Sequence, residues 1–178
     1  MNPFFSSGTV RETAREEKKE LVALLCAVLL LAAACGDGSE PDRAAPSPSP
    51  TPTFATATAL LDTEDGSTLI TVEVAETQAQ RSRGLMFREA LAEDSGMVFV
   101  WFKETSGAFW MKNTLIPLSI AFFDVRGKIL RILDMEPCRS EPCKLYDPGV
   151  RYMGALEVNQ GAFERWGVAE GDFIRLTR

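Results

Sequence analysis

The chain has no histidine among its 178 residues, and this absence removes several kinds of functional site. Imidazole is the usual general base near neutral pH and a common zinc ligand, so Ser-His-Asp triads, Cys-His pairs and His-ligated zinc are excluded. An enzyme would have to rely on carboxylates, Lys, Tyr or Cys, and only a group with a shifted pKa titrates near neutrality. The sequence therefore favours a protein without catalysis, and no cofactor or metal is expected.

Positive charge is also scarce. The chain has 19 Lys and Arg against 25 Asp and Glu, for a net charge of -6 and a pI near 4.8. The basic residues are scattered, whereas nucleic-acid binding needs a basic patch, so no nucleic-acid partner is expected. Hydrophobic residues make up 46% of the chain, which is enough for one ordinary core.

The apolar run from Leu21 to Ala34 follows a segment that contains Arg15, Lys18 and Lys19. It is shorter than the roughly 20 residues that a bilayer-spanning helix needs. A positively flanked run of this kind that ends in small residues predicts a secretory signal peptide over residues 1–34. The alternative is a buried core helix, but a polar, proline-rich segment follows instead of a packing partner.

The end of this run, Ala32-Ala33-Ala34-Cys35 followed by Gly36, resembles the lipobox of bacterial lipoproteins. In that family the Cys thiol is acylated with diacylglycerol and becomes the new N-terminus. The usual pattern has Leu three residues before the Cys, where this chain has Ala32. The resemblance implies export and a lipid anchor at Cys35, on the outer face of the cell membrane or on the periplasmic side of the envelope.

Residues 35–59 are predicted to combine the lipidated Cys35 with a disordered tether. The sequence "GDGSEPDRAAPSPSPTPTFATATA" alternates Pro with Ser and Thr, which favours extended conformations without a core. A recognition motif for a proline-binding domain is the less favoured alternative. Residues 60–178 then form the globular domain.

Apolar and polar residues alternate along several short segments of this domain, as in half-buried strands. They predict a mainly β, single compact domain like a barrel or sandwich, with six to seven short strands and two short helices. Thr77 is expected to cap the first helix, and Asn159 is expected to cap the second helix. Gly167 is expected to end the second helix, and Gly127 is expected to be left-handed in a turn. The strands are expected at 68–76, 96–102, 108–111, 117–124, 128–135, 150–158 and 172–177.

Five ordered motifs, "RGLMFRE", "GMVFVWF", "FWMKNTLIPLSIAFFD", "YMGALEVNQG" and "GVAEGD", resemble the family called domain of unknown function 192. They cover nearly the whole domain, from about residue 69 to residue 176. The resemblance implies a compact, mainly β fold that is commonly exported in bacteria. It brings no established activity.

Of the four cysteines, Cys26 lies in the expected signal peptide and Cys35 is the lipidation candidate, which leaves Cys138 and Cys143. Outside the cytoplasm such a pair most often forms a disulfide. A thioredoxin-like redox pair would have two intervening residues and begin a helix, and a zinc clip would need further ligands. The structural disulfide is the favoured interpretation.

Polar residues within the family motifs form a candidate ligand-binding rim: Arg83, Lys112, Asn113, Glu157 and Asn159. A Lys-Glu pair with an amide beside apolar surfaces could bind a small polar ligand. In the alternative, which is favoured, Asn113 secures a turn and Glu157 pairs with a basic neighbour.

Methionine and aromatic residues allow two further hypotheses. Five Met residues suggest a soft-metal site, and five aromatic residues suggest a platform for stacking sugars; core packing is favoured for both sets. The sets are Met86, Met97, Met111, Met135, Met153 and Trp101, Trp110, Trp166, Tyr146, Tyr152.

The sequence thus predicts an envelope-anchored lipoprotein whose domain binds a small molecule or an envelope partner without catalysis. One alternative is a carboxylate-dependent hydrolase of an envelope polymer, with Asp124, Asp134 and Glu157 as the only plausible acid-base groups. Such an enzyme needs two carboxylates facing each other across a cleft, at about 5–10 Å. The other alternative is a purely structural scaffold.

Overall fold

The computed structural model describes residues 51–177. The expected signal peptide at 1–34, the lipidation site Cys35 and most of the expected tether lie outside the described residues. In the described part, no helix is both long and apolar enough to cross a bilayer.

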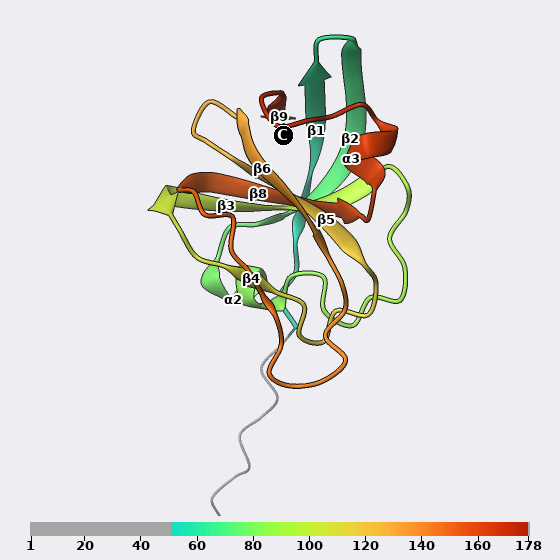
Figure 1. Ribbon diagram of the computed structural model, residues 1–178, viewed down its shortest axis with the longest axis vertical. Helices are drawn as coiled ribbons and strands as arrows, with labels where there is room; N and C mark the ends of the chain where they lie inside the picture. Colours follow the sequence, from blue (N-terminus) through green and yellow to red (C-terminus); the bar gives the residue numbers. More distant parts are fainter. Residues whose placement is uncertain (1–50, 178) are drawn as a thin grey trace, which may run out of the picture. The chain divides into compact units, whose positions relative to one another are not determined.

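The domain is mainly β, as the sequence predicts, with nine strands and two short helices in the part shown in colour in Figure 1. In chain order the elements are β1 (Ala55–Thr63), β2 (Gly66–Ala75), α2 (Gln78–Arg83), β3 (Ser95–Thr105), β4 (Phe109–Trp110), β5 (Leu118–Phe123), β6 (Ile129–Met135), β7 (Leu145–Tyr146), β8 (Tyr152–Asn159), α3 (Ala162–Arg165) and β9 (Phe173–Thr177).

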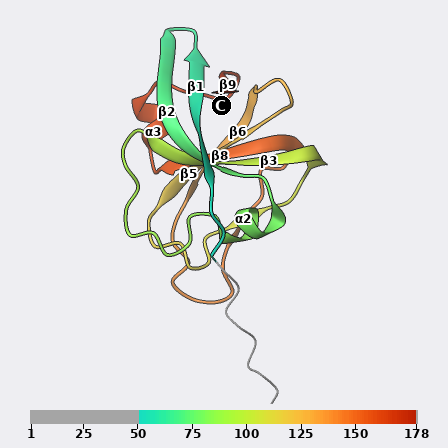
Figure 2. The same cartoon turned by 180° about the vertical axis from the view of Figure 1, so that it is seen from behind.

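Seven strands form one sheet in the order β6-β5-β8-β3-β2-β1-β9, and β4 pairs with β7 in a small second sheet. Only the β2–β3 pair in the large sheet is parallel. The sheet coils so that its outer strands meet at one end, where Ile129 N–H donates to Asp172 O (2.8 Å) and Ile174 N–H donates to Gly127 O (2.8 Å). The two outer strands do not pair along their length, so the fold is sandwich-like and not a closed barrel (Figures 1 and 2).

Strand β1 extends the fold toward the N-terminus. Residues 55–59, which the sequence assigned to the tether, form the first half of β1 and pair with β2. Alternate residues in the middle of this strand are buried, at Ala57, Ala59 and Leu61. Alanine and threonine alternate here, and alanine is a weak hydrophobic signal, so the period of two is hard to see in the sequence.

Side chains on the two faces of the large sheet form two separate hydrophobic clusters, because successive residues of a strand point to opposite faces. We call them the aliphatic cluster and the aromatic cluster. The aliphatic cluster is built mainly from Ala59, Leu61, Ile70, Val72, Val74, Val98, Leu156, Val158, Phe163 and Ile174. The aromatic cluster includes Leu85, Met97, Phe99, Met111, Phe122, Met135, Tyr146 and Tyr152, with Trp101 and Phe109 packed against it.

Most helix caps and turn glycines lie where the sequence predicts them. Thr77 caps α2 in a capping box with Gln80, and Gly127 is left-handed (φ 84°), with Ile174 O only 2.1 Å from where a Cβ would lie. Gly167 (φ 68°) follows α3 as expected. The prediction that Asn159 caps this helix is wrong, because Gly161 occupies the N-cap and no side chain caps the helix.

Candidate functional site

A pocket of about 340 Å³ opens beside α2, where β3, β8 and the segment around β4 meet. We call it the aromatic pocket, because five aromatic residues belong to its lining. They are Phe99, Trp101, Phe109, Trp110 and Tyr152. Gln78, Arg81, Ser82 and Thr105 supply its polar groups.

The aromatic walls pack edge to face. The ring centroids of Phe99 and Phe109 are 5.2 Å apart at 89°, and those of Trp101 and Tyr152 are 5.4 Å apart at 84°. Alternation along β3 places Phe99 and Trp101 on the same face. Such contacts add to the stability that burial provides, so the walls are preorganised before any ligand arrives.

Tyr152 fixes the rim of the aromatic pocket. Its side chain is 1% exposed, and its hydroxyl donates a 2.6 Å hydrogen bond to the carbonyl of Gly107. Burial, together with the charge of Asp147, raises the pKa of Tyr152 to about 12. The phenol therefore stays protonated and continues to donate.

Arg81 brings a positive charge to the pocket from α2. Its guanidinium lies 5.2 Å from the centre of the Trp101 ring, and its Nη1 donates to Glu76 O (2.5 Å) and Val100 O (3.0 Å). These bonds hold the guanidinium beside the Trp101 ring. Within residues 51–177 no carboxylate forms an ion pair with Arg81, so its charge is available to a ligand.

The structure divides the aromatic residues that the sequence grouped as a sugar platform. Trp101, Trp110 and Tyr152 converge on the aromatic pocket, and Trp110 is 49% exposed. Trp166 packs against the aliphatic cluster instead. Tyr146 lines a second pocket of about 280 Å³ beside the disulfide.

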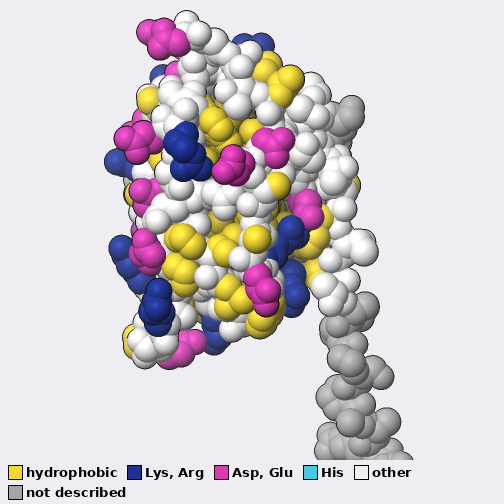
Figure 3. Space-filling model, turned by 90° about the vertical axis from the view of Figure 1, so that its right-hand side faces the viewer, with side chains coloured by type: hydrophobic (Ala, Val, Ile, Leu, Met, Phe, Trp, Pro, Cys, Tyr) yellow, Lys and Arg dark blue, Asp and Glu magenta, His cyan; other side chains and the backbone are white. Residues whose placement is uncertain are grey.

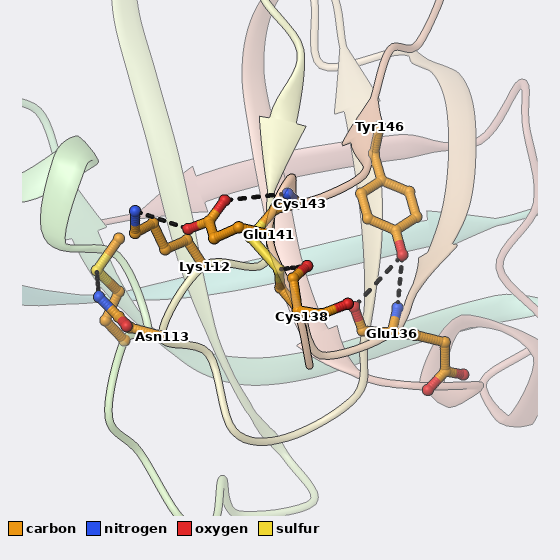
Figure 4. The surroundings of a disulfide bond; sticks show 9 residues. Lys112, Asn113, Glu136, Cys138, Glu141, Cys143 and Tyr146 are labelled. Atoms are coloured by element: carbon orange, nitrogen blue, oxygen red, sulfur yellow. Dashed lines mark hydrogen bonds and ion pairs between the residues drawn. A yellow bond between two sulfur atoms is a disulfide. The ribbon is translucent and has the colours of Figure 1, made fainter.

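The disulfide joins Cys138 and Cys143, with a Cα–Cα distance of 5.4 Å, as the sequence predicts. It closes a small loop between β6 and β7 (Figure 4). The Nζ of Lys112 lies 2.8 Å from Oε1 of Glu141 in this loop, and hydrogen bonding to Lys112 lowers the pKa of Glu141. Lys112 therefore ties the β4–β5 connection to the disulfide loop.

The five residues of the predicted rim do not form one site. Figure 4 shows Lys112 reaching toward Glu141, while Asn113 points away from the disulfide. Asn113 is left-handed (φ 57°), and its carbonyl accepts a 2.8 Å hydrogen bond from Phe87 N–H. The structure thus places Asn113 where the favoured alternative put it, in a turn.

Arg83 and Asn159 also contact the segment 84–94, which connects α2 to β3. The Arg83 guanidinium lies 4.7 Å from the centre of the Phe87 ring. Asn159 Nδ2 donates to the carbonyls of Leu91 (2.9 Å) and Ala92 (3.2 Å). Together with Asn113, these residues fix the segment over the aromatic-cluster face of the sheet.

Glu157 is the one rim residue whose environment is unusual. It lies on β8 between Met97 of β3 and Ile120 of β5, and only 5% of it is exposed. The predicted basic partner is not there: no hydrogen bond or ion pair joins its carboxyl to another described residue. Burial raises the pKa of Glu157 to about 8, so the group is mostly neutral at pH 7.

The other acid-base candidates lie elsewhere. Ser119 Oγ donates to Asp134 Oδ1 (2.5 Å); because Ser119 pairs with Val158, the residue after Glu157, this contact lies on the opposite face of the sheet. In the β5–β6 turn, Asp124 Oδ1 accepts two backbone N–H bonds (2.8 and 2.9 Å), which outweigh its partial burial and lower its pKa. The three carboxyl groups are not gathered into one site.

Glu73 was not singled out from the sequence, although it shares the sheet face of Glu157 with Met97 between them. It is ion-paired with Arg88 of segment 84–94. Three of the five methionines, Met97, Met111 and Met135, are 0–1% exposed within the aromatic cluster. These three act as core packing.

Two crystal structures resemble the domain. A protein of Sinorhizobium meliloti 1021, described as a candidate transcription regulator, is 34% identical with a TM-score of 0.66, over 70% of this chain and 96% of that one. A protein of unknown function from Novosphingobium aromaticivorans is 28% identical with a TM-score of 0.65, over 78% of this chain and 99% of that one.

No curated protein matches the chain. A family model, DUF192, with the description "Uncharacterized ACR, COG1430", matches residues 60–176. This range holds all five motifs and every residue of the aromatic pocket, from Gln78 to Tyr152. The chain belongs to the DUF192 family.

Proposed function

We propose that this protein is an exported lipoprotein, anchored through Cys35, whose domain binds a small acidic sugar in the aromatic pocket without catalysing a reaction. The observation that carries the proposal is the pairing of a preorganised aromatic wall with the unneutralised guanidinium of Arg81. The family has no established activity, and the chemistry of this site is what supports the function.

The chemistry of the pocket suits a sugar better than a flexible apolar ligand. Aromatic rings offer flat faces to the C–H side of a pyranose, and the polar groups of Gln78, Ser82 and Thr105 can reach its hydroxyls. The volume of about 340 Å³ admits one sugar ring with a substituent. Arg81 favours a sugar that carries a carboxylate, because a guanidinium binds carboxylates through two parallel hydrogen bonds.

The positions of the carboxyl groups support binding without catalysis. A glycoside hydrolase needs two carboxyl groups facing one cleft, and the aromatic pocket has no Asp or Glu in its lining. Asp134 and Glu157 lie on opposite faces of the sheet. The hydrolase alternative therefore has no support at this site. A purely structural scaffold does not require a ligand pocket.

The description of the Sinorhizobium neighbour as a candidate transcription regulator suggests DNA binding as a second function. Charge argues against it for this chain, because a net charge of -6 repels the phosphate backbone. Export also fits better, since the Cys138–Cys143 disulfide suits an oxidising compartment.

The binding proposal is tested by calorimetric titration with two sugars that differ in one acidic group, N-acetylmuramic acid and neutral N-acetylglucosamine. We expect the acidic sugar to bind about tenfold more tightly, because its carboxylate accepts a charged hydrogen bond from the Arg81 guanidinium. Arg81→Gln should remove the difference, Trp101→Leu should weaken both sugars, and Trp166→Phe should change neither. Equal binding of the two sugars by a folded parent protein would refute the acidic-sugar assignment.

The anchor is tested separately by radiolabelled palmitate incorporation in a bacterial host. We expect label in the parent protein and none in Cys35→Ala. A labelled Cys35→Ala protein, or an unlabelled parent that is still exported, would contradict the lipoprotein assignment.

A further inference from the structure

Four large hydrophobic side chains are exposed at one end of the domain, on β4, on β7 and on two connecting segments. They are Phe87 (53% exposed), Trp110 (49%), Leu115 (54%) and Leu145 (64%). We call this group the apolar end. In Figure 3, hydrophobic side chains gather on the lower part of the side shown, with both basic and acidic side chains among them.

Local contacts connect the members of the apolar end. Trp110 and Leu145 are paired directly across β4 and β7, so they project from the same face of this small sheet. Their neighbours Phe109 and Tyr146 project from the other face, into the aromatic cluster. The hydrogen bond from Phe87 N–H to Asn113 O brings segment 84–94 to the connection that also carries Leu115.

Basic side chains accompany the aromatic rings at this end. The guanidinium of Arg83 lies 4.7 Å from the Phe87 ring centre, and the Nζ of Lys112 lies 5.6 Å from the Trp110 ring centre. Lys144 lies over the Tyr146 ring at 4.6 Å, on the face of the small sheet opposite Leu145, and lines the second pocket. Aromatic rings flanked by long basic side chains are typical of protein surfaces at the level of lipid headgroups, where the ring sits at the boundary and the charge reaches the phosphates.

The described chain also enters the domain at this end. Gln80 Nε2 donates a 2.7 Å hydrogen bond to the carbonyl of Thr53, and Phe54 packs against the aromatic cluster. Figures 1 and 2 show the chain from residue 51 joining the domain beside α2 and β4, at the end opposite the β1–β2 turn. Residues 36–50 would link this point to a lipidated Cys35, and at about 3 Å per residue they reach at most about 45 Å when extended.

We propose that the apolar end rests on the surface of the membrane that carries the anchor. This inference depends on the proposed lipidation of Cys35. A tether of this length keeps the domain at a high effective concentration near the lipid, so contacts too weak to bind a free protein suffice. The side chains would enter the headgroup region, as interfacial aromatic residues do, with Arg83, which has no ion pair among the described residues, toward lipid phosphates.

The orientation has a consequence for the proposed ligand. Trp110 belongs both to the apolar end and to the lining of the aromatic pocket. A domain seated in this way opens its pocket close to the membrane plane. Sugars attached to lipids would then be presented directly to it.

The test uses the lipidated protein in phosphatidylcholine vesicles with brominated or ordinary acyl chains. Bromine quenches indole fluorescence only at close range, and we expect brominated lipid to quench the parent protein. Trp110→Phe should remove most of the quenching, because the remaining Trp101 and Trp166 are partly buried. Leu115→Ser combined with Leu145→Ser should reduce it as well.

The matched control is Val125→Ser. Val125 is 77% exposed in the β5–β6 turn, outside the apolar end, so its loss removes an exposed apolar side chain and should leave the quenching unchanged. Protein that is recovered with the vesicles but is not quenched would overturn the membrane contact alone. Protein that is not recovered with the vesicles would overturn the anchor and the contact with it.

A further measurement separates lipid from protein partners. The same quenching is recorded over a wide range of protein-to-lipid ratios. Contact with lipid gives a constant quenched fraction. Quenching that falls as the protein becomes crowded would show that the apolar end binds a second copy of the chain, and would contradict the proposal.

Discussion

The two faces of the seven-stranded sheet are packed in different ways. The aliphatic cluster consists mostly of Ala, Val, Leu and Ile, and it contacts α3 and β9. The aromatic cluster holds three buried methionines, several aromatic rings and the buried carboxyl of Glu157, and two pockets open beside it. The aliphatic face contributes apolar packing, which many similar side chains could provide. The aromatic face carries polar and aromatic groups that packing alone does not require.

The largest expected effect concerns Glu157. Its pKa is raised from 4.5 to about 8, so well below pH 4.5 the group is neutral in both the folded and the unfolded protein and has no effect on stability. As the pH rises to 8, only the unfolded state ionises freely, and the folded protein loses about 4 kcal/mol of stability. Glu157→Gln should therefore match the parent at pH 4 and exceed it by about that amount at pH 8.

Urea unfolding of the parent and of Glu157→Gln at pH 4, 6 and 8 checks this prediction. Glu164→Gln, at an exposed position on α3, is the matched control and should follow the parent at every pH. Parallel pH profiles for the parent and Glu157→Gln would show that the carboxyl has a partner or a solvent contact that keeps it ionised.

A substitution on the aliphatic face should lower the stability of the protein and leave ligand binding unchanged. Leu156 is fully buried in the aliphatic cluster, and Leu156→Ala should reduce the free energy of unfolding by about 3 kcal/mol, through lost burial and the cavity that remains. Sugar binding to the folded fraction should be unchanged, as calorimetry would show. Lost binding in a folded variant would mean that the two faces are coupled.

Removing the disulfide should lower stability less than Leu156→Ala does. Replacing Cys138 and Cys143 with Ser frees a small loop and should lower stability by about 2 kcal/mol, measured by thermal unfolding. Because the loop borders the second pocket and not the aromatic pocket, sugar affinity should not change. A large loss of affinity would place the ligand beside the disulfide.

The smallest effect on stability is expected for Tyr152→Phe. It removes the hydrogen bond to Gly107 O, which is worth about 1 kcal/mol. The same bond holds the pocket rim, so sugar affinity should fall while the core stays packed. Unchanged affinity would show that the rim does not need this bond.

The sequence predicts much of this fold because most of its signals are local. Thr77 caps α2, Gly127 occupies a left-handed turn and the strands alternate as expected. Strand β1 was missed because Ala57 and Ala59 carry little hydrophobic signal, although β2 and β9 both pair with it. Asn159 resembles a helix cap in sequence, but its side chain binds segment 84–94.

The site was harder to predict because it depends on contacts between distant segments. The candidate rim was chosen from polar residues of the family motifs, yet Lys112 and Asn113 point in different directions and Glu157 has no basic neighbour. The aromatic pocket joins α2, β3, β4 and β8, and no local pattern distinguishes Trp101 in this pocket from Trp166 in the aliphatic cluster.

The three indoles provide the most direct test of ligand binding at the aromatic face. Each indole N–H gives its own signal in a nitrogen-15 correlation spectrum, with Trp101 and Trp110 in the aromatic pocket and Trp166 beside the aliphatic cluster. On titration with N-acetylmuramic acid, the account predicts that the Trp101 and Trp110 signals shift together and saturate, while Trp166 stays fixed. A shift of Trp166 alone, or no saturable shift of Trp101, would contradict it.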